Sequence, residues 1–325
     1  MDIQPLFKAV GFLLLLIFGI PGNIFIIFRF TYSRLLEKKL LPTNIILMTL
    51  ALANLLVLLS RIIPQFLNAI GIIDLLDDSE CKLVIFTYRA NRAMSICVTS
   101  LLSCYQCILI TPNTKVWINL RKRVTQNILF IIIVLWIINI SVYPYFVLNT
   151  LARRNLTTSP YTLHLVYCDA DFLNYIAYIV NGFFYVLRDF VFVGLMILAS
   201  SYIIYSLLQH EKCMKGIRSS DKYKRRTVEY KASRAVILLV ILYVSLFGLD
   251  NSMWIYTLNL SNVSPDMNEI RIFLASSYSA LSPVVIIITN PKLQQCFLLC
   301  NRKRPLSLPY EQCLDSNGQV YSISK

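Results

Sequence analysis

The 325-residue sequence has little of what a water-soluble enzyme needs. Only 15% of its residues are charged and 9 are glycines, whereas 57% are hydrophobic and the mean hydropathy is +0.62. No glycine-rich phosphate loop, zinc-ligand spacing or nucleophile elbow occurs in it. The composition excludes an ordinary soluble domain. We expect no enzyme activity, no cofactor and no metal site.

Long apolar runs are what the sequence has instead. Runs of 18 or more apolar residues are typical of membrane-spanning helices. The first run is too long for a signal peptide and lacks a small-residue cleavage site, so we expect it to remain as an anchor. We predict an all-α integral membrane protein, a seven-transmembrane helix bundle forming one domain over residues 1–300, with a cytoplasmic tail over 301–325. The predicted helices cover approximately 6–30, 43–66, 83–110, 126–149, 174–208, 231–258 and 268–290.

The distribution of the net charge of +14 predicts the orientation of the bundle. Lysine and arginine gather in the segments after the first, third, fifth and seventh runs, as they do in cytoplasmic loops. We therefore expect the N-terminus outside and the C-terminus in the cytoplasm, with no nucleic-acid partner. His164 and His210 then lie on opposite sides of the membrane and cannot act together. The basic loop 209–231 is either a solvated loop facing anionic lipid or a docking surface, and the two roles are compatible.

Polar residues inside the apolar runs are the candidate site. On a helix with 100° per residue, six residues of the third run form one stripe, and such a stripe must face the bundle interior. Arg89 falls about 60° to one side of that stripe, nearer a seam between helices. Tyr185 and Arg188 share a face of the fifth helix, and Asp250 and Trp254 share a face of the sixth. The stripe consists of Tyr88, Arg92, Ser95, Thr99, Ser103 and Gln106.

Each arginine at mid-membrane costs roughly 2.5–3.5 kcal/mol on insertion scales, so it pairs, lines a cavity or serves a function. One interpretation is structural, with Asp189 and Asp250 neutralising two of Arg61, Arg89, Arg92 and Arg188. The other assigns arginines to a ligand, because an arginine fork suits a carboxylate or a sulfate. We expect Arg89 to pair at a seam, with Asp250 or a loop carboxylate, and Arg92 with Arg188 to receive an anionic group. Tyr88, Tyr185 and Trp254 would supply aromatic walls, and Arg61 and Asp250 complete the predicted set.

Three covalent modifications are predicted on the same topology. Cys81 opens the third helix and Cys168 lies in the second outer loop, both facing an oxidising compartment, so a Cys81–Cys168 disulfide is expected. Among four glycosylation sequons, Asn155 is the candidate because it lies in the longest outer loop. Cys296 and Cys300, just inside the membrane, suit reversible palmitoylation.

Seven helices with these two cysteines resemble a G-protein-coupled receptor. The resemblance is closer to the type-1 vomeronasal receptors and the fish olfactory receptors class A related, and it covers residues 6–300. The third helix lacks the Asp/Glu-Arg-Tyr triplet of the wider superfamily, and Asn54 stands where an aspartate is usual. The motifs that carry the resemblance are Ser60–Gln65 (SRIIPQ), Leu101–Gln106 (LLSCYQ), Arg188-Asp189, Leu249-Asp250 and Leu281–Pro283 (LSP).

The resemblance implies a chemosensory receptor in the plasma membrane. A small odorant or pheromone, anionic if the arginines receive it, would bind between the outer halves of the helices and favour an active arrangement. A heterotrimeric G protein would read that arrangement inside, near Thr111, Lys115, Lys224, Arg225 and Arg226. A receptor for another small molecule is the near alternative. A transporter or channel is the distant one, because the odd number of spans and the lack of a repeat disfavour it.

Overall fold

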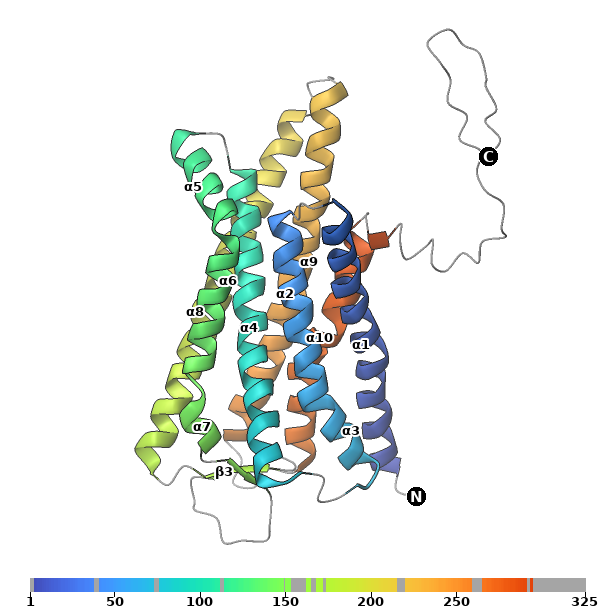
Figure 1. The fold of residues 1–325 in the computed structure, drawn as a ribbon, viewed down its shortest axis with the longest axis vertical. Helices are drawn as coiled ribbons and strands as arrows, with labels where there is room; N and C mark the ends of the chain where they lie inside the picture. The colour runs from blue at the N-terminus through green and yellow to red at the C-terminus, as the bar shows by residue number, and fades with distance from the viewer. Residues whose placement is uncertain are drawn as a thin grey trace, which may run out of the picture.

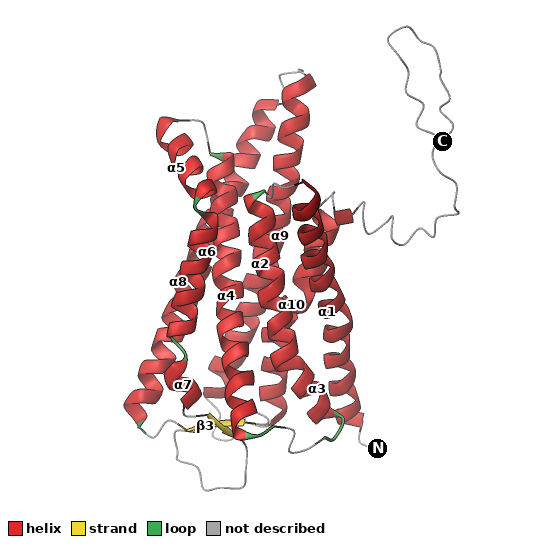
Figure 2. Cartoon of the chain, viewed as in Figure 1, coloured by secondary structure: helices red, strands yellow, loops and turns green. Residues whose placement is uncertain are grey.

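The computed structural model describes residues 3–37, 41–72, 76–111, 114–148, 150–152, 162–164, 168–171, 174–214, 220–258, 265–290 and 293–294. The predicted tail 301–325, the sequon at Asn155 and the cysteines Cys296 and Cys300 lie outside these residues. In the described part the chain is almost entirely helical, and its strands are confined to one end of the molecule (Figure 2).

The described helices run side by side as a bundle (Figure 1). Five of them are long: α1 (Ile3–Glu37), α4 (Asp78–Ile110), α8 (Tyr175–Met214), α9 (Ser220–Leu258) and α10 (Pro265–Thr289). Helix α4 occupies the centre, because it packs against α2, α6, α8 and α9. The start of α1 lies at the same end of the bundle as the strands, and the end of α10 lies toward the opposite end.

Within the described residues, six helical segments are each long and apolar enough to cross a membrane, and a bent pair raises the number to seven if it counts as one span. Five of the six agree with predicted runs as single helices, and the sixth, Pro42–Ala69, combines three elements. Apolar side chains face outward along these segments, including Leu14, Phe18, Phe28 and Phe190. Such exposure suits a lipid environment, and the molecule is an all-helical membrane bundle.

The second predicted helix is interrupted by a π-helical turn. The chain runs through α2 (Pro42–Val57), the turn η1 (Leu58–Ile62) and α3 (Ile63–Ala69), and the N–H of Ile63 bonds to the carbonyl of Leu58. Pro64 follows directly and cannot donate a backbone hydrogen bond, so the widened turn lies where a regular ladder would fail. The turn carries Arg61 into the interior, where only 3% of its surface is exposed.

The fourth predicted helix, 126–149, is wrong as a single element. The structure divides this part of the chain into α5 (Lys115–Gln126), α6 (Ile128–Ser141) and α7 (Pro144–Leu148). Helix α6 has 14 residues and is roughly 21 Å long, short of the ~30 Å hydrocarbon core. The break before α7 falls at Pro144, since a proline lacks the donor that a continuous helix needs. The axes of α5 and α6 meet at 66°.

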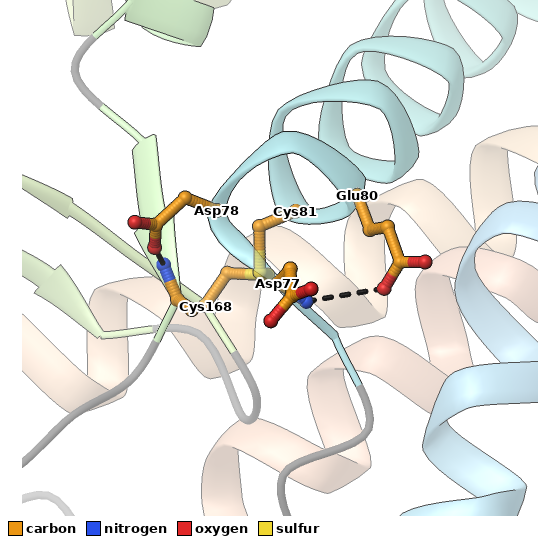
Figure 3. The surroundings of a disulfide bond; sticks show 6 residues. Asp77, Asp78, Glu80, Cys81 and Cys168 are labelled. Atoms are coloured by element: carbon orange, nitrogen blue, oxygen red, sulfur yellow. Dashed lines mark hydrogen bonds between the residues drawn. A yellow bond between two sulfur atoms is a disulfide. The ribbon is translucent and has the colours of Figure 1, made fainter.

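A small sheet closes one end of the bundle beside the start of α4. Its strands β1 (Thr150–Ala152), β2 (Thr162–His164) and β3 (Cys168–Asp171) are antiparallel, in the order β1-β3-β2. The predicted Cys81–Cys168 disulfide is present, with Cα atoms 5.9 Å apart. Asp78 reinforces it by accepting a hydrogen bond from the N–H of Ala152 at 2.8 Å, and Glu80 accepts one from the N–H of Asp77 (Figure 3). The sheet is thereby fixed to α4.

A polar network joins α2, α4 and α10 in the middle of the bundle. The Asn54 amide donates to the Ser282 hydroxyl at 2.8 Å and accepts from Ser95 at 2.7 Å. The Thr99 and Tyr278 hydroxyls share a hydrogen bond at 2.8 Å. The predicted stripe on α4 does face the interior, because Ser95, Thr99, Ser103 and Gln106 are all buried. The network fixes the position of α4 relative to α10, on the side of Arg92 that lies away from the sheet.

Candidate functional site

Two arginines and an aspartate from three helices form the core ion cluster, which we define as Arg92, Asp250 and Arg271. Nη2 of Arg92 on α4 lies 3.0 Å from Oδ2 of Asp250 on α9, and Nε of Arg271 on α10 lies 3.7 Å from Oδ1. The Asp250 side chain is 10% exposed, whereas both arginine side chains are 30% exposed. The buried carboxylate thus holds two cations that retain accessible surface.

Tyr88 connects this cluster to a further arginine. Its hydroxyl accepts a hydrogen bond from Nη1 of Arg92 at 3.2 Å. On the other side, the Arg61 guanidinium lies 5.2 Å from the centroid of the Tyr88 ring, in the geometry of a cation–π contact. The π-helical turn in the second span is what brings Arg61 to this position. Arg61, Tyr88 and Arg92 therefore form a continuous polar line from η1 to α4.

A small cavity borders the core ion cluster. Its volume of about 20 Å³ is room for about one water molecule, far below the 300–1,000 Å³ of typical ligand pockets. An organic ligand therefore fits only if the surrounding side chains move apart. The ion pair between Arg92 and Asp250 is one of the contacts that must change. The cavity is lined by Arg92, Ser95, Tyr243, Leu246, Phe247, Asp250, Leu274, Ala275, Tyr278 and Ser279.

A second group of charges, the seam cluster, lies between α4, α8 and the junction of α6 with α7. Arg188 donates to Oδ1 of its neighbour Asp189 through Nε at 3.0 Å and Nη2 at 2.7 Å. Its third nitrogen donates to the Tyr143 hydroxyl. Tyr143 and Tyr185 stack with centroids 5.2 Å apart, and Arg89 lies 5.6 Å from the Tyr185 centroid. We define the seam cluster as Arg89, Tyr143, Tyr185, Arg188 and Asp189.

The structure corrects two of the predicted pairings. Arg89 does not bind Asp250, because Arg92 holds that carboxylate while Arg89 points to the α8 side. Arg92 and Arg188 do not form a joint anion site, because each is bound to a different aspartate in a different cluster. Arg92 and Arg188 are thus each paired with an aspartate, whereas Arg61 and Arg89 contact aromatic rings. Arg89 lies against the Tyr185 ring of α8.

Some predicted site residues lie outside the part that can be described. Helix α9 includes Trp254 and Lys224–Arg226, but nothing is described of their side chains. Thr111 follows the last residue of α4 and its hydroxyl donates to the carbonyl of Cys107 at 2.8 Å. Lys115 begins α5 and is exposed. In the described residues, no group of three His, Cys, Asp or Glu side chains could hold a metal ion.

Three residues of the site were missed by sequence reasoning. Arg271 lies near the start of the seventh predicted helix, where it reads as an interfacial cation. Arg271 meets Asp250 only at one relative depth of α9 and α10, and no pattern within a single helix indicates that depth. Tyr243 and Tyr278 meet edge to face, with centroids 5.0 Å apart, and line the cavity wall. Helical periodicity does place Tyr243 on the same helix face as Asp250.

A larger cavity, of about 490 Å³, lies toward the opposite half of the bundle. Three helices line it: α8 through Ile204, Leu207 and Leu208, α9 through Arg234, Ile237 and Leu238, and α10 through Thr289. All seven residues come from the end of α8, the first half of α9 and the end of α10, so the cavity lies away from the disulfide end. It is mainly apolar and contains one guanidinium.

A helical membrane bundle with ion pairs in its interior, capped at one end by a disulfide-bonded sheet, defines a polytopic membrane protein. Comparison with known proteins gives the family. Residues 8–298 match the model of the vomeronasal organ pheromone receptor family. The chain belongs to this family, whose members are chemosensory G-protein-coupled receptors. It is a multi-pass membrane receptor and not an enzyme.

Individual relatives agree with that assignment over nearly their full length. The chain is 39% identical to olfactory receptor class A-like protein 1 of Danio rerio over 298 residues, which are 90% of this chain and 92% of the relative. It is 27% identical to human vomeronasal type-1 receptor 3, covering 91% of this chain and 96% of the relative. Vomeronasal type-1 receptor 90 of Rattus norvegicus is 26% identical, covering 86% and 89%. The sequence resemblance to this family is confirmed.

Proposed function

We propose that this chain detects a small odorant or pheromone at the core ion cluster and signals to a heterotrimeric G protein at the opposite end. The proposal takes the bundle as seven spans with the N-terminus and the sheet outside. The basic excess of the loops at the other end supports that orientation. The relatives named as olfactory and vomeronasal receptors support the ligand class.

The observation that carries the ligand site is the sharing of Asp250 between Arg92 and Arg271. These three side chains join α4, α9 and α10 beside a cavity that is too small for a ligand as it stands. A ligand that enters must alter the contacts among the three helices. Binding then favours a different arrangement of α9, which is how a ligand shifts a population between two states. Because the core ion cluster joins α4, α9 and α10, a ligand bound there changes the arrangement of these helices and thereby signals.

The chemistry of the cluster favours an anionic ligand. Two guanidinium groups meet one carboxylate, and each arginine side chain is 30% exposed. Arg92 also lines the cavity. A carboxylate or sulfate on the ligand accepts hydrogen bonds from a guanidinium as well as Asp250 does. Tyr88, Tyr243, Phe247 and Tyr278 provide aromatic surface for the remainder of the ligand. Arg61 extends the positive surface, and Arg89, Tyr185 and Arg188 support α4 and α8 from the seam.

The same proposal assigns the larger cavity to the G protein. An apolar cavity of this size between helix ends accepts an apolar helix face from a partner, and Arg234 suits a carboxylate at its rim. Thr111, Lys115, Lys224, Arg225 and Arg226 would surround it as the basic, G-protein-facing surface. Neutralising Lys224, Arg225 and Arg226 together should weaken nucleotide exchange while agonist binding is kept. Unchanged exchange would leave this stretch without a role in coupling.

The ligand proposal is tested in cells that contain a promiscuous G protein. A panel of aryl-alkyl carboxylates, each with its matched amide and amine, should activate the wild-type receptor in the order carboxylate, amide, amine. Arg92→Ala should abolish the preference for the carboxylate, and Lys8→Ala is the matched control. Lys8 forms an ion pair with Glu269 at 2.7 Å at the outer ends of α1 and α10, away from the cavity lining. Best agonists that prove to be amines would refute the anionic assignment.

A further inference from the structure

The helix α5 differs from the membrane-spanning helices in its amphipathic pattern. Its sequence, KVWINLRKRVTQ, contains no acidic residue. Five of its exposed side chains are basic or carry an amide. Its axis turns by 66° from that of α6. If α6 crosses the bilayer, α5 runs closer to the membrane plane than to the membrane normal. Its 12 residues are too few to span a membrane.

The α5 surface divides into three sectors around the helix axis. Trp117, Arg121, Val124 and Thr125 are partly buried and face the rest of the protein. Val116 and Leu120, one turn apart, are 74% and 37% exposed and form an apolar flank. Lys115, Lys122 and Arg123 are exposed and fall within about 100° of one another, between that flank and Ile118, which is 47% exposed. An exposed apolar flank beside a basic sector is the pattern of a helix that lies in a membrane interface.

Arg121 fixes α5 on the end of α4. Its Nη2 donates to the carbonyl of Leu109 at 2.9 Å and approaches those of Ile108 and Thr111 at 3.2 and 3.3 Å. These carbonyls belong to the end of α4, where backbone acceptors lack helical partners and the helix dipole is negative. The Tyr105 and Thr125 hydroxyls, 3.3 Å apart, form a second tie. The orientation of α5 is therefore set by the protein, with its apolar flank and basic sector left outward.

We propose that α5 is an interfacial anchor that binds anionic lipid headgroups of the cytoplasmic leaflet through Lys122 and Arg123. The placement of this end in the cytoplasm rests on the proposed function. Val116 and Leu120 enter the boundary between headgroups and acyl chains, and the two cations lie at the depth of the lipid phosphates. Charge complementarity selects the occupant, because the cytoplasmic leaflet is rich in anionic lipid. Arg121 is a positioning residue for this contact.

Trp117 provides the reporter, since it lies in the docked sector of α5, about 60° from Leu120 of the apolar flank. The purified full-length protein is placed in detergent micelles, and brominated phosphatidylserine or brominated phosphatidylcholine is titrated in. The quenching of Trp117 is obtained by subtracting the fluorescence of Trp117→Phe from that of the wild-type protein at each lipid fraction. We expect half-quenching at a several-fold lower mole fraction of phosphatidylserine than of phosphatidylcholine. Lys122→Gln should raise the phosphatidylserine value roughly fivefold, the effect expected for one surface cation.

Two controls separate lipid binding from general damage to the protein. Arg34→Gln removes an exposed arginine from the last turn of α1 and should leave both titrations unchanged. Val116→Ser should weaken quenching by both lipids equally, because it removes apolar contact and no charge. As a test of the positioning role, Arg121→Gln should raise the fluorescence anisotropy decay rate of Trp117 by freeing α5 from α4.

Three outcomes overturn the proposal. Equal quenching by the two lipids excludes selection by charge, and an unchanged titration with Lys122→Gln excludes this sector as the binding surface. If neither lipid quenches Trp117 but a GDP-bound heterotrimeric G protein changes its fluorescence, the surface binds a protein instead of lipid. Because both faces of the receptor are accessible in a micelle, these results do not depend on agonist or orientation. Failure of the proposed function, seen in the cell assay, is therefore distinguishable.

Discussion

The core ion cluster and the seam cluster contain the same kinds of groups in different connections. In the core ion cluster, Arg92 and Asp250 belong to α4 and α9, so their distance of 3.0 Å measures the separation of two helices. In the seam cluster, Arg188 and Asp189 are adjacent on α8, so their contact is kept wherever α8 moves. An ion pair between two helices breaks or shortens when the helices move relative to each other. A pair within one helix neutralises charge and does not restrain the position of that helix.

The two clusters also contact α4 in different ways. The core ion cluster reaches α4 through a charge-assisted contact in a cavity that is open to change. The seam cluster reaches α4 through the ring of Tyr185, which faces Arg89, and is closed by the stacked rings of Tyr143 and Tyr185. Ring stacking depends on close packing and tolerates little movement. We infer that the seam holds α4 and α8 together while α9 moves relative to both.

Replacing the two aspartates should give the largest difference between the clusters. Asp250→Asn leaves Arg92 and Arg271 without their shared anion, and removing one partner of a buried pair costs about 3–5 kcal/mol. We expect the lower part of that range, because both arginines keep some exposure and can be hydrated. The loss is measured as a lower thermal midpoint of the purified receptor. Raised basal nucleotide exchange should accompany it, since the tie between α4 and α9 is gone.

Asp189→Asn is the matched control for Asp250→Asn. Arg188 keeps its hydrogen bond to the Tyr143 hydroxyl, so stability should fall less and basal exchange should stay at the wild-type level. If Asp189→Asn raises basal exchange as much as Asp250→Asn, the two clusters do not differ as we describe.

Arg92 provides the next largest effect, on agonist potency. Hydrogen bonds to charged groups contribute about 1.5–3 kcal/mol, so Arg92→Ala should raise the half-maximal carboxylate concentration about 10- to 150-fold. Arg188→Ala should change it by less than about threefold, because Arg188 lines no part of the cavity. Both variants are compared at equal surface expression, measured by antibody binding to intact cells. Equal losses would place the ligand across both clusters.

Much of this site could be predicted from the third helix alone. The residues from Tyr88 to Gln106 recur with helical periodicity, and the buried stripe they form follows from that spacing. The 60° offset between Arg89 and Arg92 does give them different neighbours, but Arg89 meets α8 and Arg92 meets α9, the reverse of the predicted partners. Periodicity describes rotation about one helix, so it succeeds for questions that concern a single helix.

The pairings between helices could not be predicted in the same way. Which arginine meets Asp250 depends on the depth and rotation of α9 relative to α4 and α10, and these are set by packing over the whole bundle. The network around Asn54 is part of that packing, and its members come from three separate spans. The π-helical turn at Leu58–Ile62 adds a local rotation that a 3.6-residue period does not contain. Arg61 therefore reached the interior for a reason absent from the pattern.

Tyr143→Phe should lower stability and leave agonist potency unchanged. It removes the hydroxyl that accepts from Arg188 and leaves the ring, so the stack with Tyr185 is kept. The free energy of unfolding should fall by about 1.5 kcal/mol, the lower value for a hydrogen bond to a charged group. Agonist potency should be unchanged at equal surface expression. A shift in potency without a change in the thermal midpoint would make Tyr143 part of the ligand site.

Arg89→Ala should give the smallest effect of these changes. Its cation–π contact with Tyr185 contributes about 0.5–1 kcal/mol at a partly exposed site, so the thermal midpoint should fall slightly. Potency should change far less than in Arg92→Ala, although the two arginines lie one turn apart on the same helix. Arg89→Lys is the control, because a lysine retains a cation over the ring and should restore most of the stability. If Arg89→Ala loses as much potency as Arg92→Ala, the 60° between them does not separate a ligand side from a seam, and α4 meets the ligand on both faces.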